Sequence, residues 1–268
     1  MKLFTALYDD SRILKHFLDH YGAAGVSDFY IAVSPGLASA VAAFMPDFNI
    51  EVFEGLNVAD SFCCGVSAVT EMRKQRQGKC EWAVIVDLDE FIEFPDEIPA
   101  LLSRAEREGT NVIRGIMYDR FSIDGRLVAF SDSCDLHQLY PVRSRFTSHV
   151  MQGCDHKGVI VKGLLDSSIA HHEFRDEQIF STMLEVSHFK WNDRALDRVR
   201  QAHEIISKAG FYCAVEYQRV LEHYEQYGRF AWETFGGELV AGSKPTHRVS
   251  KPITPRRQRI AGTDRVGT

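Results

Sequence analysis

Cysteine is scarce in this chain, and its spacing excludes its common metal and redox uses. The six cysteines lie at positions 63, 64, 80, 134, 154 and 213. None of them forms a CxxC pair of the kind that binds zinc or exchanges disulfides, and the adjacent pair is poorly placed for an ordinary disulfide. We interpret all six as buried thiols of a protein in a reducing compartment.

Long apolar runs are also missing. No stretch of about 18 apolar residues could form a membrane-spanning helix, and Asp9 and Asp10 follow the first residues too soon for a signal peptide. We therefore expect a cytoplasmic protein. A chain of 268 residues with 45% hydrophobic content can bury one substantial core, and it shows no internal repeat.

Basic residues are few outside the C-terminal segment. Residues 244–268 hold seven of the 31 Lys and Arg residues and one of the 37 acids, which leaves 24 bases against 36 acids elsewhere. An acidic body disfavours nucleic acid as a partner. The basic tail is a candidate for peripheral contact with anionic lipid headgroups at the inner face of the membrane or with an acidic partner. The alternative is a solvated, disordered terminus.

The first 110 residues alternate short β-like runs with helical patterns. This alternation predicts an α/β fold of the Rossmann type, a mostly parallel sheet flanked by helices on both faces. The expected strands are 3–8, 29–33, 50–53 and 82–86, and the expected helices are 11–24, 37–44 and 60–77.

From residue 111 the pattern changes to shorter β-like stretches, which predict a mixed β region closed by two helices. The expected strands are 111–120, 127–130, 137–142, 158–161, 169–174 and 184–190, and the closing helices are 193–208 and 213–227. Asp124-Gly125 is a turn signal between two of these strands. We expect one domain over 1–230, divided into residues 1–110, 111–190 and 191–230, and a C-terminal extension over 231–268.

Two carboxylates follow the last apolar run of the first half. Asp87 and Asp89 come directly after the run 82–86, where ligands of open α/β sheets bind. In extended geometry these two side chains project to one side and Glu90 to the other. Close carboxylates repel unless a cation lies between them, so the pattern predicts a divalent ion that bridges to phosphate oxygens. The alternative is an acidic strand exit that leads into the next helix.

A second polar pattern ends the β-like stretch 184–190. Period-two geometry places His188 and Lys190 on the same side, after two core residues. An imidazole can complete a metal sphere, and an ammonium can offset the charge of a diphosphate. The alternative is a hydrogen-bonded core histidine beside a surface lysine.

The end of the first expected strand carries a third polar group. We expect Asp10 to cap the following helix, which leaves Tyr8 and Asp9 to meet a nucleobase or ribose. Two further clusters, 155–157 and 171–173, have the composition of surface loops.

Taken in order, these motifs resemble bacterial family 2-like glycosyltransferases of the GT-A fold. The resemblance runs from about residue 3 to 230, and its most specific elements are the segments DLDEF at 87–91 and HFKW at 188–191. It implies that residues 1–110 hold a nucleotide-sugar and that residues 111–190 face a saccharide or lipid-linked acceptor.

The resemblance also implies roles for single residues. A Mn²⁺ or Mg²⁺ ion would be held by Asp87, Asp89 and His188, and the donor would be contacted by Tyr8, Asp9, Asp10, Asp87, Leu88, Asp89 and Lys190. Families of this kind generally invert the anomeric centre, which requires a carboxylate as general base.

No matched motif identifies the base. Glu173 is the first candidate, followed by Asp119 and Asp155. Two other classes stay open: a non-catalytic nucleotide- or sugar-binding module of the same fold, and a phosphohydrolase of the haloacid dehalogenase type with Asp87 as nucleophile.

Overall fold

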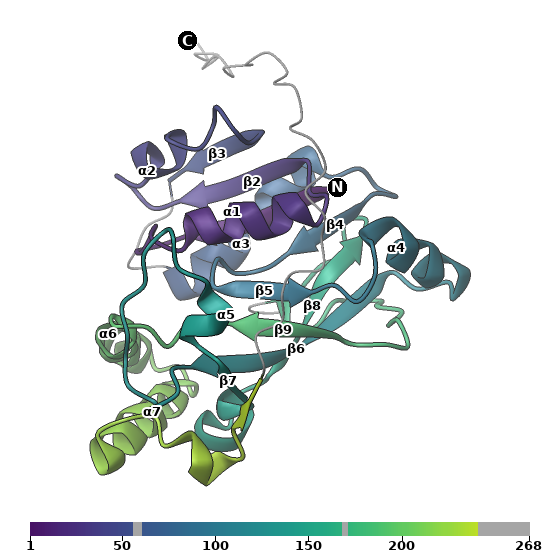
Figure 1. Cartoon of the computed structure of the whole chain (residues 1–268). Helices are drawn as coiled ribbons and strands as arrows, with labels where there is room; N and C mark the ends of the chain where they lie inside the picture. The colour runs from purple at the N-terminus through teal and green to yellow at the C-terminus, as the bar shows by residue number, and fades with distance from the viewer. Residues whose placement is uncertain (56–60, 168–170, 241–268) are drawn as a thin grey trace.

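The computed structural model describes residues 1–55, 61–167 and 171–240, and it shows a mixed sheet with helices on both faces (Figure 1). The first half of the sheet is parallel. Its strands are β1 (Lys2–Leu7), β2 (Asp28–Val33), β3 (Ile50–Glu54) and β4 (Trp82–Ile85), arranged in the order β3-β2-β1-β4. The connecting helices are α1 (Leu14–Ala23), α2 (Ala38–Ala42) and α3 (Ser61–Arg76). The predicted Rossmann-type α/β arrangement is confirmed.

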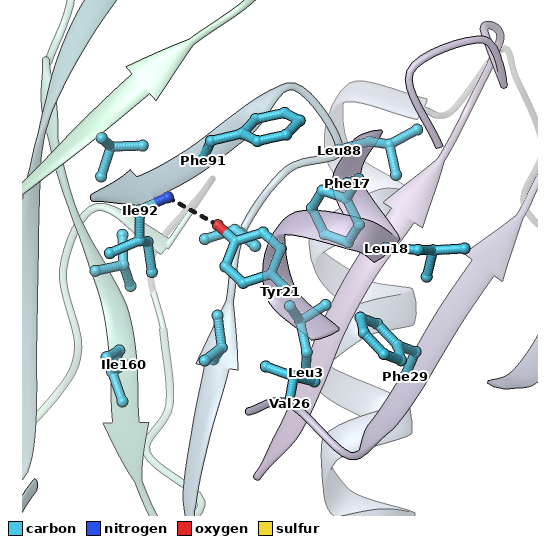
Figure 2. Close-up of a cluster of buried hydrophobic side chains, with 14 of the residues drawn as sticks. Leu3, Phe17, Leu18, Tyr21, Val26, Phe29, Leu88, Phe91, Ile92 and Ile160 are labelled. Atoms are coloured by element: carbon cyan, nitrogen blue, oxygen red, sulfur yellow. Dashed lines mark hydrogen bonds between the residues drawn. The ribbon is translucent and has the colours of Figure 1, made fainter. Parts of the chain in front are cut away.

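Alternation along the buried strands divides the apolar side chains between two faces. In β1, Leu3 and Leu7 join one hydrophobic cluster with α1, whereas Phe4 and Ala6 join another with α3. Figure 2 shows the first cluster, in which Leu88 packs inward. Burial of one such side chain contributes about 1.5–3 kcal/mol, so this core holds the strand ends in place.

One buried phenol connects α1 to the chain segment that follows β4. The hydroxyl of Tyr21 donates to the carbonyl of Glu90 at 2.8 Å. It also accepts from the backbone N–H of Ile92 at 3.1 Å, the bond drawn in Figure 2. Glu90 and Ile92 belong to β5 (Glu90–Glu93), which is followed by α4 (Ile98–Arg107). The hydrogen bonds fix the position of the segment directly after the Asp87 and Asp89 pair.

The second half is mostly antiparallel. Its strands are β6 (Val112–Phe121), β7 (Val142–Ser144), β8 (His156–Lys162), β9 (Leu184–His188) and β10 (Glu238–Leu239). β8 joins this half to β4, β6 lies between β8 and β7, and β9 pairs with β5 and with β6. The helices are α5 (Leu136–Leu139), α6 (Ala195–Lys208) and α7 (Ala214–Tyr227), and a third apolar cluster fills the space between β6 and these last two helices. The mixed half and its closing helices are thus confirmed.

Several expected elements of the second half are wrong. Residues 127–130 form no strand, because the carbonyl of Val128 accepts from the side chain of Tyr140 and from the backbone of Asp193. Residues 137–142 begin with α5 instead, since the carboxylate of Asp135 caps its N-terminus. Asp124-Gly125 does form a turn, in which the N–H of Gly125 donates to the carbonyl of Ser122.

Three further expectations concern the strand at 169–174 and the tail, the cysteines, and membrane-spanning helices. Residues 169–170 and the tail from 244 lie outside the described residues, and 171–174 add only an isolated bridge. Cys80 and Cys154 are exposed and Cys134 and Cys213 are partly exposed, so the prediction of buried thiols is wrong for these four. Within the described ranges, every helix is too short or too polar to cross a membrane.

Candidate active site

The main cleft lies where the strand order reverses. The chain runs from β1 outward to β3 and then returns to the other side of β1 as β4, which is the position where open α/β sheets bind ligands. A cleft of about 370 Å³ opens there. Its lining includes residues 6–10 at the end of β1, residues 85–90 at the end of β4, and side chains of α6 and α7.

Residues 87–90 form a tight turn, which we call the acidic turn. The N–H of Glu90 donates to the carbonyl of Asp87 at 3.1 Å, so the expected extended geometry is wrong. Glu90 was also expected to point away from the pair. Its carboxylate instead accepts from the backbone N–H of Asp87 at 2.8 Å, which folds Glu90 back beneath the turn.

A buried lysine holds the acidic turn together. Lys157 on β8 is only 2% exposed, and its ammonium lies 3.0 Å from Asp87 Oδ2 and 2.7 Å from Glu90 Oε2. The expectation of a surface loop at 155–157 is therefore wrong at Lys157, because a buried ammonium requires the paired carboxylates that the turn supplies.

The pKa values of the turn follow from this pairing. Burial raises the pKa of Asp87, but the charge and hydrogen bond of Lys157 outweigh it and lower the pKa to about 2. Burial raises the pKa of Glu90, and the neighbouring Asp87 adds to this despite the opposing effect of Lys157. Asp87 is thus ionised at neutral pH, and half of its side-chain surface is open to the cleft.

His188 faces the other carboxylate of the pair. Its Nδ1 lies 3.1 Å from Asp119 Oδ1, and its Nε2 lies 3.7 Å from Asp89 Oδ1. Asp119 on β6 is fully buried and also accepts hydrogen bonds from the Thr147 backbone and the Trp191 indole. Burial lowers the pKa of His188, but Asp89 and Asp119 together raise it above its ordinary value. Asp119 orients the ring, so that Nε2 points toward Asp89.

Asp89 and His188 are the residues of the cleft whose arrangement fits a divalent ion. Among the described residues, no three His, Cys, Asp or Glu side chains are grouped closely enough to hold a metal ion by themselves. Asp89 and His188 nevertheless form a pair in which Asp119 is the kind of outer partner that metal-bound histidines have. Mg²⁺ is commonly held by one or two carboxylates together with substrate phosphates, so a two-ligand protein site is compatible with it.

The residues after β1 divide into two environments. Asp10 is buried and is held by Arg12 at 2.7 Å, and Arg12 also pairs with Asp193. The expected cap is therefore wrong: α1 begins after Ile13 without a side-chain cap. Tyr8 and Asp9 line the cleft, and Asp10 does so as well, although its carboxylate is paired with Arg12. Burial raises the pKa of Asp9, and the opposing charge of Arg198 on α6 does not offset it.

The helical wall of the cleft carries a cation and a carboxylate. Lys190 lies with its ammonium 5.4 Å from the ring centre of Tyr217, and both side chains line the cleft. Glu216 on α7 also lines it, and burial raises the pKa of this carboxyl despite the charges of Lys190 and Arg219. Sequence patterns did not reveal Glu216, because helix α7 carries no motif that separates it from other surface glutamates.

The three expected base candidates lie elsewhere. Glu173 is exposed and does not line the cleft. Asp155 is buried and pairs with Arg145 at 2.6 Å, and Asp119 is fully buried behind His188. None of these three carboxylates lines the cleft.

Two histidines that were expected in a surface loop line the cleft instead. His171 is 4% exposed, and its Nδ1 lies 3.0 Å from the hydroxyl of Ser167. Its Nε2 is buried without a hydrogen-bond partner among the described residues. Burial and the nearby Lys157 lower the pKa of His171 to about 3, so the ring is neutral. His172 is half-buried, and its Nδ1 lies 2.6 Å from the carbonyl oxygen of His156.

Comparison with known proteins yields only distant likenesses. No family model and no curated protein matches the chain. Solved structures that match include the inositol-1-phosphate CTP transferase from T. maritima, with 11% identity, 77% of this chain and 95% of that chain covered, and a TM-score of 0.34. A 4-diphosphocytidyl-2C-methyl-D-erythritol synthase matches with 15% identity, coverages of 52% and 70%, and a TM-score of 0.30.

HddC from Yersinia pseudotuberculosis matches with 7% identity and a TM-score of 0.30, over 45% of this chain. The match spans only 59% of the length of HddC. At such TM-scores the likeness assigns neither an activity nor a ligand to this chain.

Proposed function

We propose that the protein is a metal-dependent glycosyltransferase that moves a sugar from a nucleoside-diphosphate donor to an acceptor hydroxyl, with inversion. The observation that carries this proposal is the Asp89–His188–Asp119 arrangement in the cleft where the strand order of the sheet reverses. An ion bound by Asp89 and His188 would neutralise charge on the departing diphosphate. Tyr8 and Asp9 would contact the nucleoside, and Lys190 would lie near the phosphates.

Glu216 is our candidate for the general base. It lines the cleft from helix α7, and its raised pKa brings it closer to the range that suits proton abstraction. In this scheme the acceptor oxygen forms a bond to the anomeric carbon and its proton passes to Glu216. The bond from that carbon to the diphosphate oxygen breaks, and the diphosphate leaves with the electron pair.

A nucleotide-binding module without turnover is the second candidate. Lys157 already pairs with both Asp87 and Glu90, so this side of the turn needs no metal to hold its shape. Such a module would bind a nucleoside diphosphate with little dependence on a divalent ion, and it would release no product. The saccharide or lipid-linked nature of the acceptor, cytoplasmic placement and membrane contact through the tail remain proposals from the sequence.

Thermal unfolding with UDP, GDP, CDP and dTDP, each with and without Mn²⁺, tests the binding step. We expect one nucleotide to stabilise the protein only when Mn²⁺ is present. At a hundredfold excess over Kd the gain is about 2.7 kcal/mol, or roughly 5–10 °C in Tm. Asp89→Ala should abolish the gain, and Asp47→Ala, an exposed carboxylate away from the cleft, should preserve it.

Equal stabilisation without Mn²⁺ would favour the binding module. Phosphate release from p-nitrophenyl phosphate would instead point to the phosphohydrolase alternative. Sugar transfer or donor hydrolysis that survives Asp89→Ala unchanged would rule out the proposed role of the metal.

A further inference from the structure

Lys157 lines the cleft beneath the acidic turn, but its side chain is only 2% exposed. Its ammonium contacts Asp87 Oδ2 at 3.0 Å and the two carboxylate oxygens of Glu90 at 2.9 and 2.7 Å. Glu90 in turn accepts from the backbone N–H of Asp87. The three side chains therefore form a closed unit in which one cation is shared by two carboxylates.

The position of this ammonium is the one that a metal ion would otherwise take between the two carboxylates. Carboxylate oxygens bind Mg²⁺ at about 2.0–2.1 Å and Ca²⁺ at about 2.3–2.6 Å. The ammonium nitrogen lies against Asp87 Oδ2 and both carboxylate oxygens of Glu90, so an ion cannot lie between these two carboxylates. By contrast, Asp89 forms no ion pair with a Lys or Arg of the described residues, and its Oδ1 lies 3.7 Å from His188 Nε2.

We propose that Lys157 is a built-in cation that closes the Asp87–Glu90 side of the turn to divalent ions and confines exchangeable metal to the Asp89–His188 side. Lys157 is thus a positioning residue that orients the Asp87 carboxylate. The inference rests on the proposed function only in that it concerns the same turn. It makes a claim of its own, since removal of the ammonium should create a cation site that the natural protein lacks.

Lys157→Met tests the inference, because methionine keeps an unbranched side chain and removes the charge. Mn²⁺ binding is followed by electron paramagnetic resonance in the absence of nucleotide. We expect Lys157→Met to bind about one more Mn²⁺ per chain than the natural protein, and its Tm to rise with Mn²⁺. Lys157→Arg retains the charge and should gain no ion.

Two double variants locate the new ion. Lys157→Met with Glu90→Gln removes one charge of each sign, so it should fold and lose the extra ion. Lys157→Met with Asp89→Ala should keep the extra ion, although Asp89→Ala alone abolishes the metal site of the proposed function. If the natural protein shows no metal-dependent nucleotide binding, the proposed function is contradicted. The extra Mn²⁺ of Lys157→Met would still support this inference.

The inference is overturned by any of three results. The first is that Lys157→Met folds and binds no additional Mn²⁺. The second is that it stays unfolded at every Mn²⁺ concentration, since an ion should then have replaced the ammonium. The third is that the extra ion persists when Glu90→Gln is added.

Discussion

The two halves of the molecule contribute different things to the cleft. Residues 1–110 form regular parallel βα units and supply the acidic turn at the end of β4. The second half, 111–240, supplies the groups that set the charge and orientation of the turn: Lys157 on β8, Asp119 on β6 and His188 on β9. A carboxylate motif thus predicts where a cleft lies, whereas partners distant in sequence set the charge and orientation of each carboxylate.

The largest expected effect is on the reaction rate, and it distinguishes the proposed base on α7 from nucleotide binding at the acidic turn. Glu216→Gln should lower the rate of sugar transfer or donor hydrolysis by about 10²–10⁴-fold, because the base is lost while the shape is retained. Mn²⁺-dependent nucleotide binding should be unchanged in the same variant. Glu222→Gln on the exposed face of α7 is the matched control. Equal rates in both variants would exclude Glu216 as the base.

Core truncations ask whether the two halves unfold together. Phe17 belongs to the cluster of the first half and Phe146 to that of the second, and both are fully buried. Phe17→Ala and Phe146→Ala should each lower the free energy of unfolding by about 3–5 kcal/mol. Because one continuous sheet joins the halves, urea unfolding should remain a single transition; a second transition in either variant would show independent halves.

Asp119→Asn tests whether a residue of the second half affects the Mn²⁺ affinity of the proposed Asp89–His188 site. The amide keeps the size of the side chain but replaces the charged acceptor at His188 Nδ1, so Mn²⁺ affinity should fall by about 10–100-fold. Isothermal titration with Mn²⁺ and the preferred nucleotide measures this loss. An affinity within twofold of the natural protein would mean that Asp119 serves the core alone.

The smallest effect concerns pH. The pKa of folded His171 is about 3 against an ordinary 6.5, so between these values the unfolded chain binds the proton first. Stability from the neutral ring is present above about pH 6.5 and is lost as pH falls, by up to about 1.4 kcal/mol per pH unit. Urea unfolding at pH 7 and pH 5 should show a steeper decline for the natural protein than for His171→Gln. An equal decline in the free energy of unfolding for both proteins would contradict the lowered pKa of His171.

Much of the first half was predictable because its periodicity is local. The run at 82–86 is apolar throughout, which is typical of a central strand covered on both faces, and β4 lies there with both neighbours in place. The second half was less predictable: apolar stretches such as 127–130 pack on the core from loops, and only long-range hydrogen bonds distinguish them from strands.

The location of the cleft follows from the sequence alone, since the order of strands and helices and the acids after β4 are properties of short segments. The folded chain was needed to show that Lys157, 70 residues beyond Asp87, is buried under the turn, and that Asp119 holds His188 rather than facing a substrate. These roles escape a sequence pattern because the pairing of charges depends on distance in space. Sheet pairing of β4, β5, β6, β8 and β9 brings these groups within hydrogen-bond reach, and no local pattern in the chain records it.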